Sequence, residues 1–198
     1  MADARFIAVI DIGKTNAKLA LFDLEEQREV TRFTTANEVV KSGVYPHYNI
    51  EHLWAFIIDG LRTLAGKHAV DAISITTHGA CAVLLDEAGK LVLPVLDYEY
   101  TGPETAASAY DALRPGFSQT GSPRLPAGLN LGAQIYWQAK AFPQEFEQLR
   151  WIVTYAQYWA YRLSGILANE VTSLGCHTDL WNYNAGDYST LVDAMGWR

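Results

Sequence analysis

The sequence predicts an α/β fold in which a mixed β-sheet is combined with helices. The chain opens with three β-rich segments joined by short turns, between residues 6 and 35. A stretch with apolar residues at helical spacing, Ile50–Lys67, then leads into another β-rich run, Val70–Thr76. Strands joined by short turns pair antiparallel, whereas a strand reached through a helix pairs parallel. We therefore expect an antiparallel meander continued by parallel strands, with helices on both faces of the sheet.

The first elements follow from apolar runs and their breaks. Phe6–Ile10 is a short apolar run typical of a buried strand, and Lys18–Phe22 and Glu29–Thr35 supply the next two strands. The predicted helix carries its apolar side chains three or four residues apart, at Leu53, Ile57, Leu61 and Leu64. After Val70–Thr76, Ala82–Leu85 predicts a further strand.

Beyond residue 98 the pattern changes to loops and helices. We interpret Tyr98–Asn169 as an inserted helical and loop region. Within it we expect a helical piece at Glu104–Leu113, an amphipathic helix at Leu131–Phe142, a short helix opened by Pro143, a strand at Trp151–Val153 and a helix at Ala156–Leu163 ended by Gly165.

Composition excludes several classes of protein. Of 198 residues, 49% are hydrophobic and 19% are charged, which is enough apolar material for a core. The net charge of -7 argues against non-specific nucleic-acid binding, which needs clustered Lys and Arg. No run approaches the ~18 apolar residues of a membrane span, so we expect a cytoplasmic protein without a membrane partner. Cys81 and Cys176 lack metal-site spacing and are predicted to be buried.

The segment Asp11-Ile-Gly-Lys-Thr-Asn16, between the first two predicted strands, offers the chemistry of a phosphate site. Gly13 permits a tight turn and a close approach of phosphate to the backbone. Lys14 and Lys18 supply positive charge for phosphoryl oxygens.

The remaining polar residues of this segment complete the set. Thr15 and Asn16 offer side-chain donors, and Asp11 at the end of a strand is able to hold a hydrated Mg²⁺. The alternative is an ordinary hairpin with a glycine turn and a capping aspartate. The GxxxxGK[ST] pattern of a P-loop is absent from the sequence.

The flanking sequence, including Lys18 and Asp23, resembles the first phosphate motif of the actin-like ATPase superfamily, which has a ribonuclease H-like core. Within that superfamily the chain resembles the FGGY carbohydrate kinases, and rhamnulose and xylulose kinases in particular. Four segments carry the resemblance, which extends over essentially the whole chain: Val9–Lys18, Ile73–Asp86, Tyr155–Gly165 and Glu170–Ser189.

The resemblance implies roles for individual residues. It implies that ATP and Mg²⁺ bind at the first motif, with Asp11 at the metal and with Gly13, Lys14, Thr15, Asn16 and Lys18 at the phosphates. Lys18 stands where the family usually has Arg, and Lys14 where Thr is common. His78 and Gly79 match the loop that contacts the sugar. Tyr98 and Glu99 depart from the family pattern, and either bind sugar hydroxyls or simply lie exposed.

The resemblance also implies what kind of protein this is. Residues 1–198 are expected to form the amino-terminal, sugar-binding lobe of a kinase that transfers the γ-phosphate of ATP to a small sugar, a ketose or deoxyketose. The catalytic base is predicted downstream of Arg198, and the nucleotide lobe outside this chain. A kinase of acids or hexoses, and a non-catalytic sugar-binding or self-associating module, remain alternatives. Monomer and homodimer are both compatible with the sequence.

Overall fold

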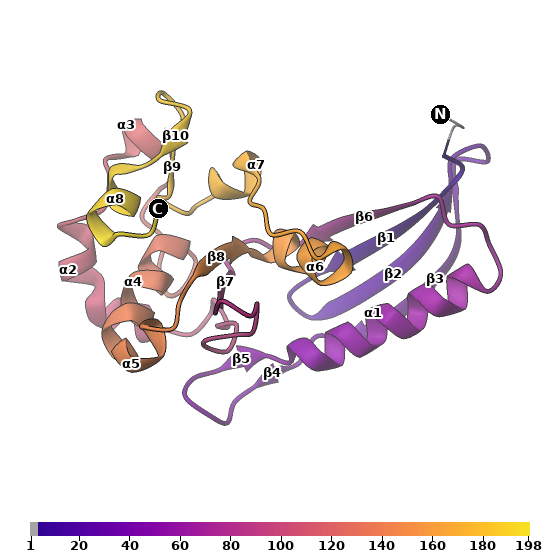
Figure 1. The fold of residues 1–198 in the computed structure, drawn as a ribbon, viewed down its shortest axis with the longest axis horizontal. Helices are drawn as coiled ribbons and strands as arrows, with labels where there is room; N and C mark the ends of the chain where they lie inside the picture. The colour runs from indigo at the N-terminus through magenta and orange to yellow at the C-terminus, as the bar shows by residue number, and fades with distance from the viewer. Residues whose placement is uncertain (1–3) are drawn as a thin grey trace. The chain divides into compact units, whose positions relative to one another are not determined.

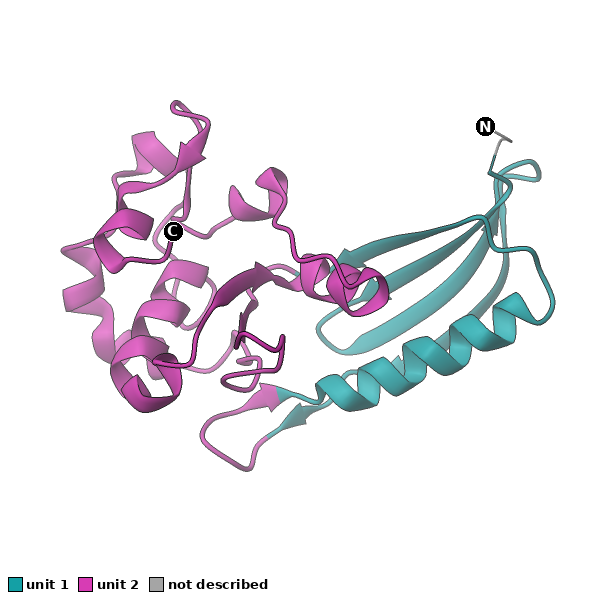
Figure 2. Ribbon diagram, viewed as in Figure 1, with its two compact units in different colours: residues 1–40, 48–78 teal, residues 41–47, 79–198 magenta. Residues whose placement is uncertain are grey.

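A computed structural model describes residues 4–198 and divides the chain into two compact units (Figure 2). The first unit comprises Met1–Val40 and Tyr48–His78, and the second comprises Lys41–His47 and Gly79–Arg198. The chain therefore crosses between units three times, after Val40, after His47 and after His78.

A four-stranded mixed sheet forms the first unit, with strand order β3-β2-β1-β6 (Figure 1). The strands are β1 (Phe6–Ile12), β2 (Asn16–Asp23), β3 (Arg28–Ala36) and β6 (Ala72–Thr77). β1 pairs antiparallel with β2 and parallel with β6, and β2 pairs antiparallel with β3. This arrangement confirms the expected meander and its continuation by a parallel strand.

One face of this sheet is buried under helix α1 (Ile50–Ala65), which Figure 1 shows beside the strands. Alternate residues of β1 and β2 are buried, and Ile10 lies directly opposite Leu19. Gly60 lets α1 approach closely, because a Cβ there would lie 2.4 Å from Leu19 Cδ2. α1 is the only helix in the described part of this unit, so a helix on the other face stays a prediction.

Local sequence sets the ends of α1. The Asn49 side chain accepts a hydrogen bond from His52 N at 3.1 Å and thereby caps the first turn. The helix ends at Ala65 with Gly66 as its C-cap, which agrees with the end of the Ile50–Lys67 pattern, where the apolar spacing stops at Leu64. Two short strands, β4 (Val39–Val40) and β5 (His47–Tyr48), lie in sequence between β3 and α1.

The second unit is mainly helical (Figure 1). Its strands are β7 (Ala82–Leu85), β8 (Trp151–Thr154), β9 (Trp181–Asn182) and β10 (Asp187–Tyr188). Its helices are η1 (Gly102–Ala106), α2 (Ala107–Asp111), α3 (Phe117–Thr120), α4 (Leu131–Ala141), α5 (Pro143–Phe146), α6 (Tyr155–Ser164), α7 (Val171–Leu174) and α8 (Thr190–Met195).

The strands and boundaries of the second unit differ from the sequence prediction. β7 does not extend the mixed sheet. It pairs antiparallel with β8, because the four buried residues of β7 meet another apolar strand of the same unit. The unit also extends beyond the predicted insertion Tyr98–Asn169, since Leu84, Leu180 and Leu191 all join its core.

Helix α4 forms the centre of the second unit and corrects the expectation of an amphipathic helix. Eight consecutive residues, 131 to 138, are buried, so no side of these turns faces solvent. The two glutamines of these turns, Gln134 and Gln138, are buried, and each amide nitrogen has a hydrogen-bond partner inside the unit. Gln134 Nε2 donates to Ala80 O at 2.6 Å, and Gln138 Nε2 donates to Tyr45 Oη at 2.8 Å.

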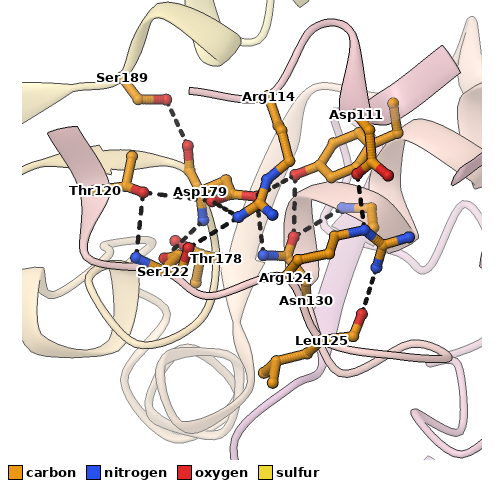
Figure 3. A network of polar contacts seen from close by, with 12 residues as sticks. Asp111, Arg114, Thr120, Ser122, Arg124, Leu125, Asn130, Thr178, Asp179 and Ser189 are labelled. Carbon is orange, nitrogen blue, oxygen red and sulfur yellow. Dashed lines mark hydrogen bonds and ion pairs between the residues drawn. The ribbon is translucent and has the colours of Figure 1, made fainter. Parts of the chain in front are cut away.

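A buried carboxylate, Asp179, is the centre of a network of polar contacts in the second unit (Figure 3). It is fully buried and accepts two hydrogen bonds from the Arg114 guanidinium, both at 3.0 Å. Tyr110, Thr120 and Asn130 also donate to this carboxylate. Burial, reinforced by the charge of Asp179, raises the pKa of Tyr110, so its hydroxyl remains a proton donor.

The two cysteines have different surroundings. Cys81 is buried as expected, whereas Cys176 is exposed, which corrects the prediction that both are buried. Cys176 directly follows Gly175, where α7 ends, and so lies on a turn outside the core. In the described part of the chain, no helix combines the length and apolar character needed to cross a membrane.

We expect Asp179→Asn to destabilise the second unit by about 3–5 kcal/mol, because it leaves the Arg114 charge, only 13% exposed, without its counterion. Asp179 has a positive φ of 60°, which Asn tolerates, so backbone strain does not contribute. The measurement is the urea midpoint of the purified chain.

Asp111→Asn is the matched control, because it breaks the more exposed ion pair with Arg124 (47% and 31% exposed) and should cost ~1 kcal/mol or less. Equal losses in the two variants would contradict the assignment of Asp179 as the centre of this network.

Candidate functional site

The turn between β1 and β2 is the centre of the candidate site. Residues 13 to 15 connect Ile12 at the end of β1 to Asn16 at the start of β2. Gly13 N donates to Asn16 O at 2.9 Å, which closes the turn. A Cβ at residue 13 would lie 3.2 Å from Asn16 O, so the tight approach explains why glycine suits this position.

Asp11 and Lys18 lie side by side across the β1–β2 pair. They are register partners, and Lys18 Nζ is 3.3 Å from Asp11 Oδ2. Both side chains are about half-exposed (41% and 43%), on the face opposite the buried Ile10 and Ile12. An exposed ion pair of this kind contributes at most ~1 kcal/mol, so a phosphate or a cation is able to separate the pair at small cost.

Tyr48 lies between the turn and the end of β6, in contact with one residue from each. Lys14 Nζ lies 5.3 Å from the ring centroid of Tyr48, and the Tyr48 and His78 rings are 5.1 Å apart. Tyr48 is 1% exposed, and His78 N donates to Ile12 O at 2.7 Å. A residue predicted to bind phosphate and one predicted to bind sugar therefore share an aromatic neighbour that the sequence did not single out.

Asn37, the residue that follows β3, donates hydrogen bonds to two backbone carbonyls of the turn. Its backbone N donates to Thr15 O at 2.9 Å, and its Nδ2 donates to Gly13 O at 2.8 Å. On the exposed side of the turn, Asn16 Nδ2 donates to Thr15 Oγ1 at 3.1 Å. No motif pointed to Asn37, because its partners are backbone atoms more than twenty residues away.

The other predicted sugar-binding residues belong to the second unit. A Cβ at Gly79 would meet no atom within 4 Å. Tyr98 O accepts a hydrogen bond from Gly128 N at 2.9 Å, and the exposed Glu99 donates through its backbone N to Asp97 Oδ1 at 3.2 Å. Their combination with His78 in one sugar site stays a prediction.

The donor chemistry of the first unit suits a hydrated magnesium ion. Among residues 4–198 no group of three or more His, Cys, Asp or Glu side chains is arranged to hold a metal. Mg²⁺ needs no such cage, because it commonly keeps several waters and takes one or two carboxylates plus phosphate oxygens. The half-exposed Asp11, with Lys18 beside it, fits that requirement.

Three aspartates near the end of the chain are engaged elsewhere. Asp179 is buried against Arg114, and Asp187 and Asp193 both form ion pairs with Arg198. The hydrogen bond donated by the backbone N–H of Tyr188, followed by those from Arg198, lowers the pKa of Asp187, which makes this carboxylate a weaker base.

Comparison with known proteins places this geometry in a family. The FGGY family of carbohydrate kinases, N-terminal domain, matches residues 6–196. A rhamnulokinase of Mannheimia succiniciproducens is 27% identical over 96% of this chain and 41% of its own length. An L-fuculokinase of Salmonella typhi is 26% identical over 96% of this chain and 42% of its own length. The chain thus spans less than half the length of these relatives.

Solved structures agree. The crystal structure of a carbohydrate kinase from Novosphingobium aromaticivorans matches with a TM-score of 0.89 and 36% identity, over 98% of this chain and 41% of that one. A xylulose kinase from Lactobacillus acidophilus, at 16% identity, shares the fold with a TM-score of 0.82 over 96% of this chain and 40% of that one. These matches confirm the expected mixed-sheet fold of the actin-like ATPases. The chain belongs to the FGGY family of carbohydrate kinases.

Proposed function

We propose that the protein containing this chain transfers the γ-phosphate of ATP, bound with Mg²⁺, to a hydroxyl of a small sugar. The observation that carries the proposal is the turn at residues 13 to 15, where the side chains of Asp11, Lys14 and Lys18 surround a tight backbone turn. Phosphoryl transfer requires mainly positioning and neutralisation of charge, and these groups supply both.

In this proposal the two lysines have distinct tasks. Lys18 would leave Asp11 to contact a phosphoryl oxygen, and Asp11 would hold the hydrated Mg²⁺ by accepting a hydrogen bond from one of its waters. Lys14 approaches the phosphates from the side of Tyr48. Gly13 keeps the backbone close, and Thr15 and Asn16 donate hydrogen bonds through their exposed side chains.

The acceptor is proposed to be a ketose or deoxyketose. The support is the similarity to proteins named rhamnulokinase and L-fuculokinase, together with His78 at the end of β6. We assign His78 and Gly79, with Tyr98 and Glu99, to the contacts with sugar hydroxyls. A single hydroxyl left without a partner is enough to discriminate strongly between sugars.

Residues 1–198 are proposed to be the amino-terminal, sugar-binding lobe, and the base and the nucleotide lobe to lie outside them. The relatives are more than twice as long as this chain, which supports the proposal. The engagement of Asp179, Asp187 and Asp193 with arginines also argues against a base among them. A cytoplasmic location and a possible homodimer remain part of the proposal.

The direct test measures ADP release with Mg·ATP across L-rhamnulose, L-fuculose, D-xylulose, other ketoses, gluconate and glycerol. We expect the product of the complete reading frame to respond to one ketose or deoxyketose. The isolated 198-residue chain should show little or no turnover, because it lacks the proposed base. Full turnover by the isolated chain would contradict the two-lobe proposal, and silence of both proteins would favour a non-catalytic module.

Asp11→Asn should lower kcat of the full-length protein by about 10²–10³-fold with little change in the KM for sugar, because the group that orients Mg²⁺ is lost. Asp59→Asn is the matched control, since Asp59 is an exposed carboxylate of α1 that pairs with Arg62 at 3.4 Å. Steady-state kinetics of both variants decide the question. A kcat for Asp11→Asn equal to that of the control would remove Asp11 from the metal site.

His78→Gln should raise the KM for sugar by about 10-fold, equivalent to one lost hydrogen bond, and leave the KM for ATP unchanged. His52→Gln serves as control, because His52 lies on α1 and contacts the Thr35 hydroxyl at 3.1 Å. Thermal unfolding verifies that each variant is folded. An unchanged KM for sugar in a folded His78→Gln protein would show that His78 has a structural role.

A further inference from the structure

Asn37 stands out because its hydrogen bonds go to the turn and not to its own neighbours. Its backbone N donates to Thr15 O at 2.9 Å, which extends the β2–β3 ladder one pair beyond Asn16 and Ala36. Its side-chain Nδ2 donates to Gly13 O at 2.8 Å. One residue from the end of β3 therefore fixes two carbonyl groups of the turn.

Fixing these carbonyls also sets the direction of the amide groups. The peptide bonds of the described chain are all trans, so each N–H points opposite to the carbonyl of the preceding residue. Because Gly13 O is directed toward Asn37, the N–H of Lys14 is directed away from it. Ile12 O is held in turn by His78 N at 2.7 Å.

Burial shows which part of the Asn37 side chain is used. The residue is 5% exposed, and within the described structure Oδ1 has no hydrogen-bond partner. The reverse orientation of the amide would place Oδ1 against Gly13 O, two acceptors in contact. A buried acceptor without a partner costs free energy. The favourable polar contact of this side chain is therefore the hydrogen bond donated by Nδ2 to Gly13 O.

We propose that Asn37 is a positioning residue that holds the Gly13–Thr15 turn in the conformation that receives the terminal phosphates of ATP. The inference rests on the proposed kinase function. Asn37 does not contact the phosphates. It acts through the Gly13 and Thr15 carbonyls, which direct the Lys14 N–H and keep the turn closed before the nucleotide binds.

The test compares three variants in the product of the complete reading frame. Asn37→Ala removes the donor, and Asn37→Asp keeps the shape while replacing the donor by an acceptor. Asn49→Ala is the matched control, because the Asn49 side chain also forms a hydrogen bond with the backbone, accepting from His52 N at the start of α1 in the same unit. Two measurements are made on each protein: kcat with the KM values for ATP and sugar, and deuterium uptake over residues 11–18.

Both Asn37 variants are expected to lower kcat by about 10–100-fold, to keep the KM for sugar within about twofold, and to speed deuterium uptake over the turn. Asn49→Ala should change neither kcat nor that uptake. A kcat for the folded Asn37 variants equal to that of Asn49→Ala would overturn the proposal.

The kinase function itself is tested separately by the unaltered protein. If that protein phosphorylates no sugar, the proposed function fails, and deuterium uptake alone decides the role of Asn37. Faster deuterium uptake over residues 11–18 in Asn37→Ala than in Asn49→Ala would still support the role of Asn37 in holding the turn, and equal uptake would overturn it.

Discussion

The first unit depends on the two-sided pairing of β1. This strand hydrogen-bonds antiparallel to β2 and parallel to β6. The carboxyl ends of β1 and β6 and the start of β2 therefore lie at one edge of the sheet. That register places the glycine turn next to His78, and it sets Lys18 opposite Asp11. The neighbouring β3 contributes Asn37 at the same edge. Groups for charge, for turn geometry and for the proposed sugar contact thus lie at the ends of four strands of one small sheet.

The second unit is organised differently, around polar groups inside an apolar core. The fully buried Asp179 forms an ion pair with Arg114 and accepts hydrogen bonds from three neutral side chains. Such a buried pair adds little net stability compared with apolar side chains, but removing one partner is costly. We therefore infer that its benefit is specificity, because it joins the short helices α2 and α3 to the segment around Asp179, where the backbone is left-handed. Gln134 and Gln138 do the same for α4 and the segments around it.

Sequence patterns predicted the elements whose signals are local. The β1–β2 hairpin follows from two apolar runs around a glycine turn, and α6 ends at Gly165 because that residue adopts a positive φ. The patterns failed where partners are distant in sequence. Three such interactions join residues more than twenty positions apart: the contact of Lys14 with Tyr48, the pairing of β7 with β8, and the hydrogen bond from Asn37 to Gly13. The expectation of an amphipathic α4 also failed, because the sequence does not distinguish a buried glutamine whose amide nitrogen is hydrogen-bonded from an exposed one.

The unequal burial of the two cysteines has a practical consequence. Cys81 is enclosed and Cys176 is exposed, so a thiol-reactive dye or spin label should attach at a single position of the second unit without prior mutagenesis. Cys176 lies outside the core, on a turn next to α7, where an added probe displaces little packing. A second label introduced into the exposed face of α1 would then give one defined pair of probes. Distance measurements between them would test whether the separation of the two probes changes when nucleotide and sugar are added.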